Sequence, residues 1–427
     1  MTKPCSFHWA DWIDGDEILD KLSRLVAIPS VIEDEHPEEG VVQEILRWCQ
    51  GDGFDPILTE VSAQRRNLLL EIHGDRPGPK LLLEAHSDTV TAGDVSMWTY
   101  PPFQLTRCED RLYGRGTADT KGNLVAAYLA VRILKQATKG IFPGSVQFLV
   151  PVDEEGMMSG IRHYIASDAA QGLDGAICCE PEDLMICIRQ KGALRLEAEF
   201  FGRMAHGAMP LTGVNPIPIM VQFLQAVADE EALAQDSLGY DRYLGWPSMT
   251  PTQIKTPIAG PQGFNVMPAS AAVSIDVRTV PGQTHSLLVS RLQQRLSAIV
   301  QAANHDLTDG RGHYLRSALE QPTIHGPITG RFNVVDDRPV TETSRDHPLV
   351  QAVAAAVESV VGADPVYAGV PGATDGTWLW AAGIPIVTIG AGNRFVPHQV
   401  DEWVSLQQLT DTVGIYADTA YRFLHHW

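Results

Sequence analysis

Residues 80–88 read Lys-Leu-Leu-Leu-Glu-Ala-His-Ser-Asp, an apolar strand-like run followed directly by a histidine and an aspartate. Four further stretches also place acid or imidazole side chains after apolar runs or in a tight glycine loop. They contribute Asp119 in the loop 114–122, Glu154 and Glu155 after 145–150, Glu180 after 176–179, and His398 beyond 384–389. Side chains at strand exits can converge at one edge of an open α/β sheet, where ligands bind. Two imidazoles and several carboxylates without a thiolate suit a pair of divalent ions such as zinc, cobalt or manganese.

The first half of the chain alternates helix-like and strand-like segments. Apolar positions repeat with helical spacing in three segments, 15–27, 38–50 and 124–137. Short β-rich runs lie at 56–60, 67–72, 80–84, 145–150 and 174–179. This alternation predicts an α/β domain with a mixed, mostly parallel sheet that is covered by helices on both faces.

The pattern changes after residue 191. Strands are expected at 193–201, 252–258, 269–279 and 331–336, with helices at 215–231 and 284–303. That order, β-α-β-β-α-β, is ferredoxin-like. Helix–strand alternation then resumes with 347–361 and 384–389. We therefore expect a discontinuous catalytic domain, 1–191 and 340–427, with an inserted α+β domain, 192–339, that serves as lid and dimerisation unit.

Composition narrows the classes of partner. A length of 427 residues fits two domains, and the net charge of −20 argues against nucleic acid or an anionic membrane as partner. The start shows no signal peptide, and the longest apolar helix candidate, near 124–134, is too short to span a bilayer. The six cysteines form no Cys-x-x-Cys pair, which favours a reducing, cytoplasmic setting.

The residues themselves suggest roles within the metal site. The spacing of His86 and Asp88 on an extended segment puts both side chains on one side, so Asp88 can orient a metal-bound imidazole. Adjacent Glu154 and Glu155 would repel each other unless cations compensate, and one of them can bind metal while the other acts as general base. Each motif alone also fits a surface polar pair or a turn. Their joint order favours a metal site.

Taken together, the motifs resemble those of the M20 metallopeptidases, the group of acetylornithine deacetylase, succinyl-diaminopimelate desuccinylase and glutamate carboxypeptidase. They are His-Ser-Asp at 86–88, Gly-Arg-Gly-Thr-Ala-Asp-Thr-Lys-Gly at 114–122, Asp-Glu-Glu-Gly at 153–156, Glu-Pro at 180–181 and Pro-His-Gln-Val-Asp-Glu at 397–402. The resemblance implies that Asp119 bridges two metals, with His86 and Glu180 on one and Glu155 and His398 on the other. It also implies Glu154 as general base, Asp88 as the residue that orients His86, and a cis peptide after Asp119.

The resemblance extends to the inserted domain. His206, in the stretch 202–210, would steady the oxyanion in the active site of a neighbouring subunit, although a loop-capping role also fits. Asn265 is similar to a substrate-contacting asparagine, and Arg278 to the guanidinium that receives a substrate carboxylate, with a surface ion pair as its alternative. One departure is Thr377 after Asp375-Gly376, where desuccinylase-like members carry arginine. A diacid substrate is therefore disfavoured.

The expected function is metal-dependent cleavage of an amide bond in an N-acyl amino acid or a short peptide-like substrate with a free carboxylate. Metal-activated water would attack the amide carbonyl, with Glu154 as general base. Two divalent ions would be the cofactors, with zinc as the expected metal and cobalt or manganese as alternatives. The chain is expected to form a homodimer. An alternative is hydrolytic deamination of an amino-aromatic or related substrate by the same activated water. A third hypothesis is a non-catalytic relative that only binds a metal or a ligand. The intact Glu154 argues against it, because a binding protein needs no general base.

Overall fold

The computed structural model describes residues 8–35, 37–261, 263–309 and 327–425. The chain divides into two compact units. The first comprises Met1–Gln190, Thr341–Val370 and Thr374–Trp427, and the second Lys191–Val340 and Pro371–Ala373.

The main sheet of the first unit is mixed. Its strands run in the order β1 (Ile57–Ser62), β2 (Arg65–His73), β6 (Pro143–Val150), β3 (Arg76–Glu84), β7 (Gly175–Cys178), β17 (Ile386–Thr388), β8 (Ile186–Gln190) and β15 (Thr341–Glu342), with β16 (Tyr367–Val370) also paired to β8. The central neighbours β6, β3, β7 and β17 are parallel. The pairs β1–β2, β2–β6, β17–β8 and β15–β8 are antiparallel. The sheet is therefore more evenly mixed than the mostly parallel sheet that was expected. β1 is joined to β2 by a two-residue turn, and so short a connection can join only antiparallel neighbours, because parallel strands need a long crossover.

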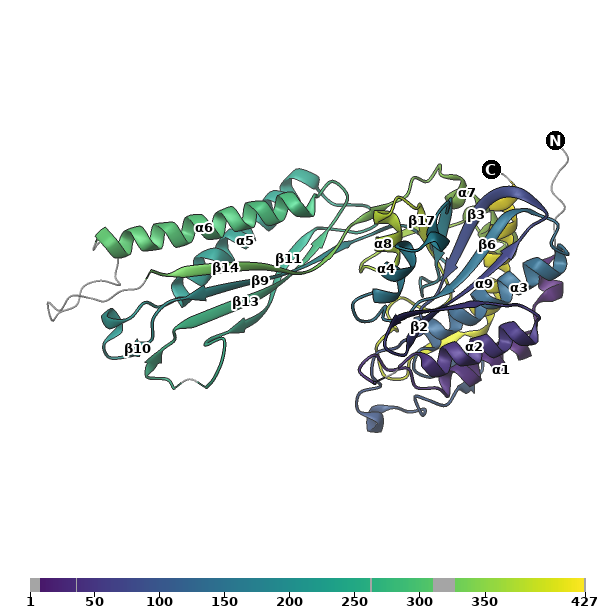
Figure 1. The fold of residues 1–427 in the computed structure, drawn as a ribbon, viewed down its shortest axis with the longest axis horizontal. Helices are drawn as coiled ribbons and strands as arrows, with labels where there is room; N and C mark the ends of the chain where they lie inside the picture. The colour runs from purple at the N-terminus through teal and green to yellow at the C-terminus, as the bar shows by residue number, and fades with distance from the viewer. Residues whose placement is uncertain (1–7, 36, 262, 310–326, 426–427) are drawn as a thin grey trace. The chain divides into compact units, whose positions relative to one another are not determined.

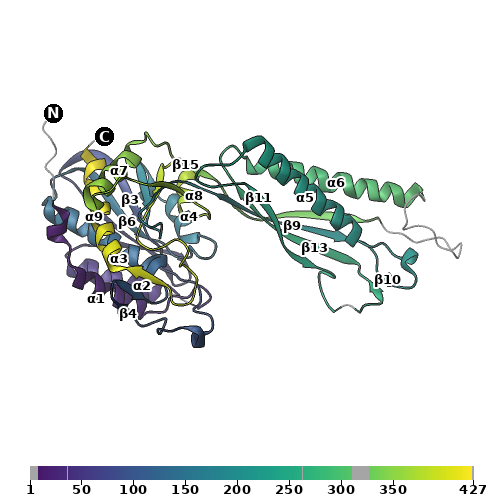
Figure 2. The same ribbon diagram turned by 180° about the vertical axis from the view of Figure 1, so that it is seen from behind.

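Helices cover both faces of this sheet (Figure 1, Figure 2). α3 (Gly122–Ala137) and α9 (Leu406–His425) pack on β3 and β6, flanked by α1 (Gly15–Val26), α2 (Glu39–Gly51) and α7 (Pro348–Val361). On the opposite face α4 (Ser159–Ile165) and α8 (Gly376–Ala381) enclose an apolar cluster that includes Leu82, Leu149 and Leu379. Burial on both faces explains why the central strands read as continuous apolar runs.

In its described residues, the second unit consists of an antiparallel sheet and two α-helices. Its elements follow the order β9 (Gly192–Phe201), α5 (Ile217–Leu238), β11 (Ser248–Lys255), β13 (Ser270–Thr279), α6 (His285–Asp309) and β14 (Thr329–Arg338). The strands lie in the order β11-β13-β9-β14. Its core joins alternate residues of β9 and β13 to the inner faces of the helices, for example Phe200 to Phe223, whose ring centroids are 5.8 Å apart. A small ribbon pairs β10 (Ala205–His206) with β12 (Val266–Met267).

The cysteines in the described residues are free thiols, and most of them are buried. Cys49, Cys178, Cys179 and Cys187 are buried and free, Cys108 is exposed and free, and Cys5 lies outside the described residues. None of the helices in the described ranges has the length and apolar character needed to cross a membrane.

Candidate active site

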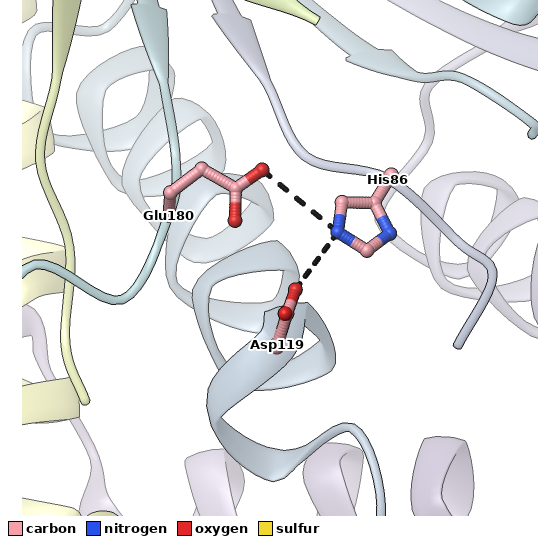
Figure 3. A group of neighbouring side chains, drawn as sticks. All are labelled: His86, Asp119 and Glu180. Atoms are coloured by element: carbon pink, nitrogen blue, oxygen red, sulfur yellow. Dashed lines mark hydrogen bonds and ion pairs between the residues drawn. The ribbon is translucent and has the colours of Figure 1, made fainter. Parts of the chain in front are cut away.

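One group of side chains gathers at the exits of β3 and β7. His86 lies just beyond β3, Glu180 just beyond β7, and Asp119 in the turn Thr117–Lys121 before α3. Nε2 of His86 is 3.0 Å from Oδ1 of Asp119 and 3.8 Å from Oε1 of Glu180 (Figure 3). Because β3 and β7 are parallel neighbours, their carboxyl ends meet at one edge of the sheet.

A second group shares Asp119. Glu155 follows β6, and His398 lies in the loop between β17 and β18 (Trp403–Ser405). Nε2 of His398 is 2.9 Å from Oε1 of Glu155 and 3.3 Å from Oδ2 of Asp119. Within each group the candidate ligand atoms all lie within 4.8 Å of one another. Asp119 thus offers one carboxylate oxygen to each group, as a bridging ligand between two ions must.

The tautomer of His86 fits metal binding. Its Nδ1 is 3.0 Å from the backbone carbonyl oxygen of Asp88. A carbonyl oxygen only accepts, so Nδ1 carries a proton, and Nε2 faces Asp119 and Glu180 as the ring nitrogen that can bind an ion when it is deprotonated. Metal-bound histidines are commonly held in this way by their second ring nitrogen.

The charges of the site also call for cations. Burial, with neighbouring carboxylates, raises the pKa of Glu154 and of Glu180 well above the ordinary value, and the pKa of Glu155 is raised by burial and by Asp119. Hydrogen bonds to Asp119 and Glu155 raise the pKa of His398 to about 10. Buried carboxylates in such proximity repel one another unless positive charge offsets them. Two divalent ions fit this donor set, which is oxygen and imidazole alone.

Glu154 belongs to neither candidate ligand group. Its carboxyl is buried and lies within electrostatic reach of His86, Glu155 and Asp119. The backbone N–H groups of Glu154 and Glu155 donate to Oδ1 and Oδ2 of Asp88, at 3.2 and 3.0 Å. The carboxyl of Glu154 therefore lies near both ligand groups without belonging to either. Its backbone position is fixed by the hydrogen bonds to Asp88.

The turn that carries Asp119 is held by Glu402, a residue for which the sequence predicted no role. Oε1 of Glu402 accepts from the N–H groups of Ala118 at 2.9 Å and Asp119 at 3.1 Å. Oε2 accepts from the N–H of Gly116 at 3.1 Å and from Nη1 of Arg115 at 2.5 Å. The expected cis peptide between Asp119 and Thr120 is present.

Two other buried acids were also missed. Glu84 and Asp375 are fully buried. The Cys178 thiol lies within bonding reach of Glu84, whereas the carboxylate oxygens of Asp375 have no hydrogen-bond partner among the described residues. Burial raises the pKa of Glu84 to about 7 and raises that of Asp375 well above its ordinary value. The glutamate at the end of the apolar run 80–84 was a visible signal, because an acid is rare at a core strand position.

The remaining predicted residues lie in the second unit. His206, in β10, is exposed, and its Nδ1 accepts from the N–H of Ala208 at 3.0 Å, which is the local capping contact of its alternative reading. The carbonyl oxygen of Asn265 accepts from the N–H of Gly207 at 2.7 Å, so the ribbon brings Asn265 next to the His206 turn. Nε of Arg278 donates to Oδ2 of Asp276 at 2.8 Å, which is the ion pair of its alternative reading.

The segment around residue 377 packs into the first unit. Thr377 is fully buried in α8, and its N–H donates to the carbonyl oxygen of Thr374. Trp378 packs against the apolar cluster under α8, and Nε1 of Trp380 donates to the carbonyl oxygen of Glu342. Both tryptophans thus help to pack α8 against the apolar cluster on this face of the sheet.

Comparison with known proteins places the chain among metallopeptidases. The family model described as peptidase family M20/M25/M40 matches residues 82–422. A probable succinyl-diaminopimelate desuccinylase of Staphylococcus epidermidis is 26% identical, over 94% of this chain and 97% of the relative. An M20 family metallo-carboxypeptidase of Sulfolobus solfataricus superposes with a TM-score of 0.72 at 18% identity, over 96% of this chain and 99% of the other. A dinuclear metal-binding M20 peptidase of Bacillus subtilis gives a TM-score of 0.68 at 16% identity, over 96% and 98%.

Proposed function

Because this chain belongs to peptidase family M20/M25/M40 and is a metal-dependent hydrolase of C–N bonds, we propose that it cleaves the amide bond of an N-acyl amino acid or a short peptide-like substrate with a free carboxylate. The observation that carries the proposal is the pair of histidine-containing groups that share Asp119 and lie beside the separate carboxyl of Glu154. The relatives are described as a desuccinylase and peptidases, so hydrolytic deamination is not favoured.

In this proposal His86 and Glu180 hold one ion, Glu155 and His398 hold the other, and Asp119 joins both. Zinc is the proposed metal, with cobalt or manganese as alternatives, because the donors are imidazole and carboxylate. Such ions supply Lewis acidity to the scissile carbonyl and bring the pKa of a bound water toward about 7.

Glu154 acts as the general base. Its buried carboxyl takes a proton from the attacking water and later returns it to the leaving amine. Burial raises the pKa of Glu154 above its ordinary value, which favours the return of the proton to the leaving amine. Asp88 keeps this carboxyl in place through the two backbone hydrogen bonds described above.

The second unit contributes the remaining roles. We propose that His206 reaches the active site of a partner subunit in a homodimer and donates a hydrogen bond to the oxyanion, using Nε2, which its contact to Ala208 leaves unused. Arg278 would receive the substrate carboxylate in place of Asp276. Asn265 would contact the substrate near His206, since its carbonyl oxygen accepts from the N–H of Gly207. The inserted unit would thus serve as lid and dimerisation surface.

The proposed substrate carries one carboxylate near the scissile bond rather than a diacid acyl group. The desuccinylase-like arginine is replaced by Thr377, and this side chain is fully buried, so it cannot clamp a second carboxylate. The four buried free cysteines fit a reducing compartment, so we place the enzyme in the cytoplasm.

An activity screen tests the proposal. The metal-free protein is reloaded with zinc, cobalt or manganese and incubated with N-acetyl amino acids, N-succinyl amino acids, dipeptides and aminobenzoates. Release of free amine from N-acetyl amino acids or dipeptides, and not from N-succinyl amino acids, is the expected result. Ammonia release from aminobenzoates, or preference for the N-succinyl substrates, would contradict it.

A further inference from the structure

The backbone that carries the proposed base is held at three successive positions. The N–H of Asp153 donates to Oε1 of Glu38 at 3.1 Å, and the N–H groups of Glu154 and Glu155 donate to the two oxygens of Asp88. Glu38 and Asp88 are both fully buried. Asp153 itself has φ of 70°, a left-handed conformation that few non-glycine residues adopt. The surroundings must therefore hold this conformation in place.

Arg65 supplies the positive charge for this arrangement. Its Nε lies 3.0 Å from Oε2 of Glu38, its Nη2 also binds Glu38, and its Nη1 is 3.2 Å from Oδ1 of Asp153. The other oxygen of Asp153 accepts from the N–H of Ser159, the first residue of α4. One planar guanidinium thus joins α2, β2 and the turn before α4, a geometry that a lysine cannot reproduce with a single ammonium group.

The neighbouring residue provides a natural comparison. Arg66, also at the start of β2, pairs with Glu39 at the start of α2, as Arg65 pairs with Glu38. The side chains of Arg66 and Glu39 are 32% and 34% exposed, whereas Glu38 is fully buried. The two pairs join the same elements, and only Arg65 reaches Asp153.

We propose that Arg65 and Glu38 are positioning residues that hold the backbone of Asp153 and so aim the carboxyl of Glu154 at the reacting water. Neither residue touches the substrate. The positive charge of Arg65 offsets the carboxylates of Glu38 and Asp153, which would otherwise repel each other. Glu38 accepts the backbone N–H of Asp153, the residue directly before the base. This inference rests on the proposed function of Glu154. Its structural part is independent of that function and states that Arg65 and Glu38 slow hydrogen exchange at the backbone N–H groups of residues 153–155.

The test compares Arg65→Met with Arg66→Met in zinc-loaded protein. Hydrogen–deuterium exchange, read by mass spectrometry on peptides that span 151–158, is expected to be about 10-fold faster in Arg65→Met and unchanged in Arg66→Met. Peptides from α3 should exchange alike in both variants, which separates local loosening from general destabilisation. Arg65→Lys keeps the charge and is expected to fold and to show intermediate exchange, so the test stands even if Arg65→Met does not fold.

Kinetics provide the second readout. With an amide that the wild type cleaves, Arg65→Met should lower kcat about 10- to 100-fold with little change in KM and full metal content. Equal exchange at 151–158 in all variants, or an unchanged kcat in Arg65→Met, overturns the inference. If the wild type cleaves no amide, the proposed function fails, and the exchange result still decides whether Arg65 holds this segment.

Discussion

The carboxylate of Asp88 accepts the backbone N–H of Glu154 at 3.2 Å. Its partner oxygen accepts the N–H of Glu155 at 3.0 Å, whereas Nδ1 of His86 lies 3.5 Å from the carboxylate and 3.0 Å from the Asp88 carbonyl. Asp88 therefore orients His86 mainly with its main chain and holds the base segment with its side chain. The role expected from the motif is thus divided between two parts of one residue.

Asp88→Asn should separate these parts. The amide keeps one acceptor, but its NH₂ faces an N–H donor, so the base segment loses a hydrogen bond while the carbonyl contact to His86 remains. We expect kcat to fall about 10- to 100-fold with two metals still bound. Metal analysis and steady-state kinetics measure this. Loss of metal from the variant would instead show that the carboxylate governs His86.

Glu154→Gln should remove the base and leave the ligand groups intact. The side chains are of similar size, and Glu154 belongs to neither group of candidate ligands. Turnover is expected to fall by a factor of about 10² to 10⁴ with unchanged metal content. Elemental analysis alongside an amide-cleavage assay checks both. Appreciable residual activity would refute the assignment.

His398→Ala should weaken one ion selectively. Its Nε2 contacts Glu155 and the shared Asp119, and His398 belongs to only one of the two ligand groups. We expect one equivalent of metal to be retained and the second to be lost on dialysis. Removal of both ions from the wild type should lower Tm, because ligands that bind only the folded state stabilise it. A variant that keeps two tightly held ions would count against His398 as a ligand.

Glu402→Gln should destabilise the turn that carries Asp119. The substitution leaves Arg115 without its buried counter-charge and weakens the contacts to three backbone N–H groups. Breaking a buried pair costs about 3–5 kcal/mol of unfolding free energy. Glu342→Gln is the control, since Glu342 pairs with Arg189 at an exposed position and should cost less than about 1 kcal/mol. Thermal melts of the metal-free proteins compare them, and equal losses would contradict the structural role of Glu402.

Mixing two inactive variants tests the in-trans role of His206. His206→Ala and Glu154→Gln each disable a homodimer if the imidazole serves the partner's site. After random subunit exchange, half of the dimers are mixed and each holds one intact site, so about a quarter of the wild-type activity should return. A mixture that stays inactive, although exchange is demonstrated with labelled subunits, would contradict the in-trans role and assign His206 to the site of its own subunit.

Much of the candidate site was predictable because its residues sit in short local motifs. His86, Glu155 and Glu180 each follow a strand of apolar residues, and parallel neighbours bring such exits together without further information. The long helices were equally accessible, since periodic burial over 12 or more residues is a strong signal, as in α1.

The parts that escaped prediction depend on tertiary contacts. Arg65 meets Asp153 across 88 positions, and Glu402 meets Asp119 across 283, so no local pattern marks either pair. Strands such as β15 and β18 have two or three residues, too few for a period to appear. The hairpin of β1 and β2 was misread as part of a parallel alternation because its turn, Ala63-Gln64, lacks the usual glycine or asparagine.

The second unit lies between two segments of the first unit in the sequence. This arrangement determines when the proposed ions could bind during synthesis. His398 and Glu402 leave the ribosome only after the entire inserted unit has been translated. A nascent chain that ends before them presents Asp119 on an unsupported turn and lacks one imidazole. Loading of the two proposed ions would thus be a late event that follows synthesis of the last ligand, and fragments released earlier would lack a complete site.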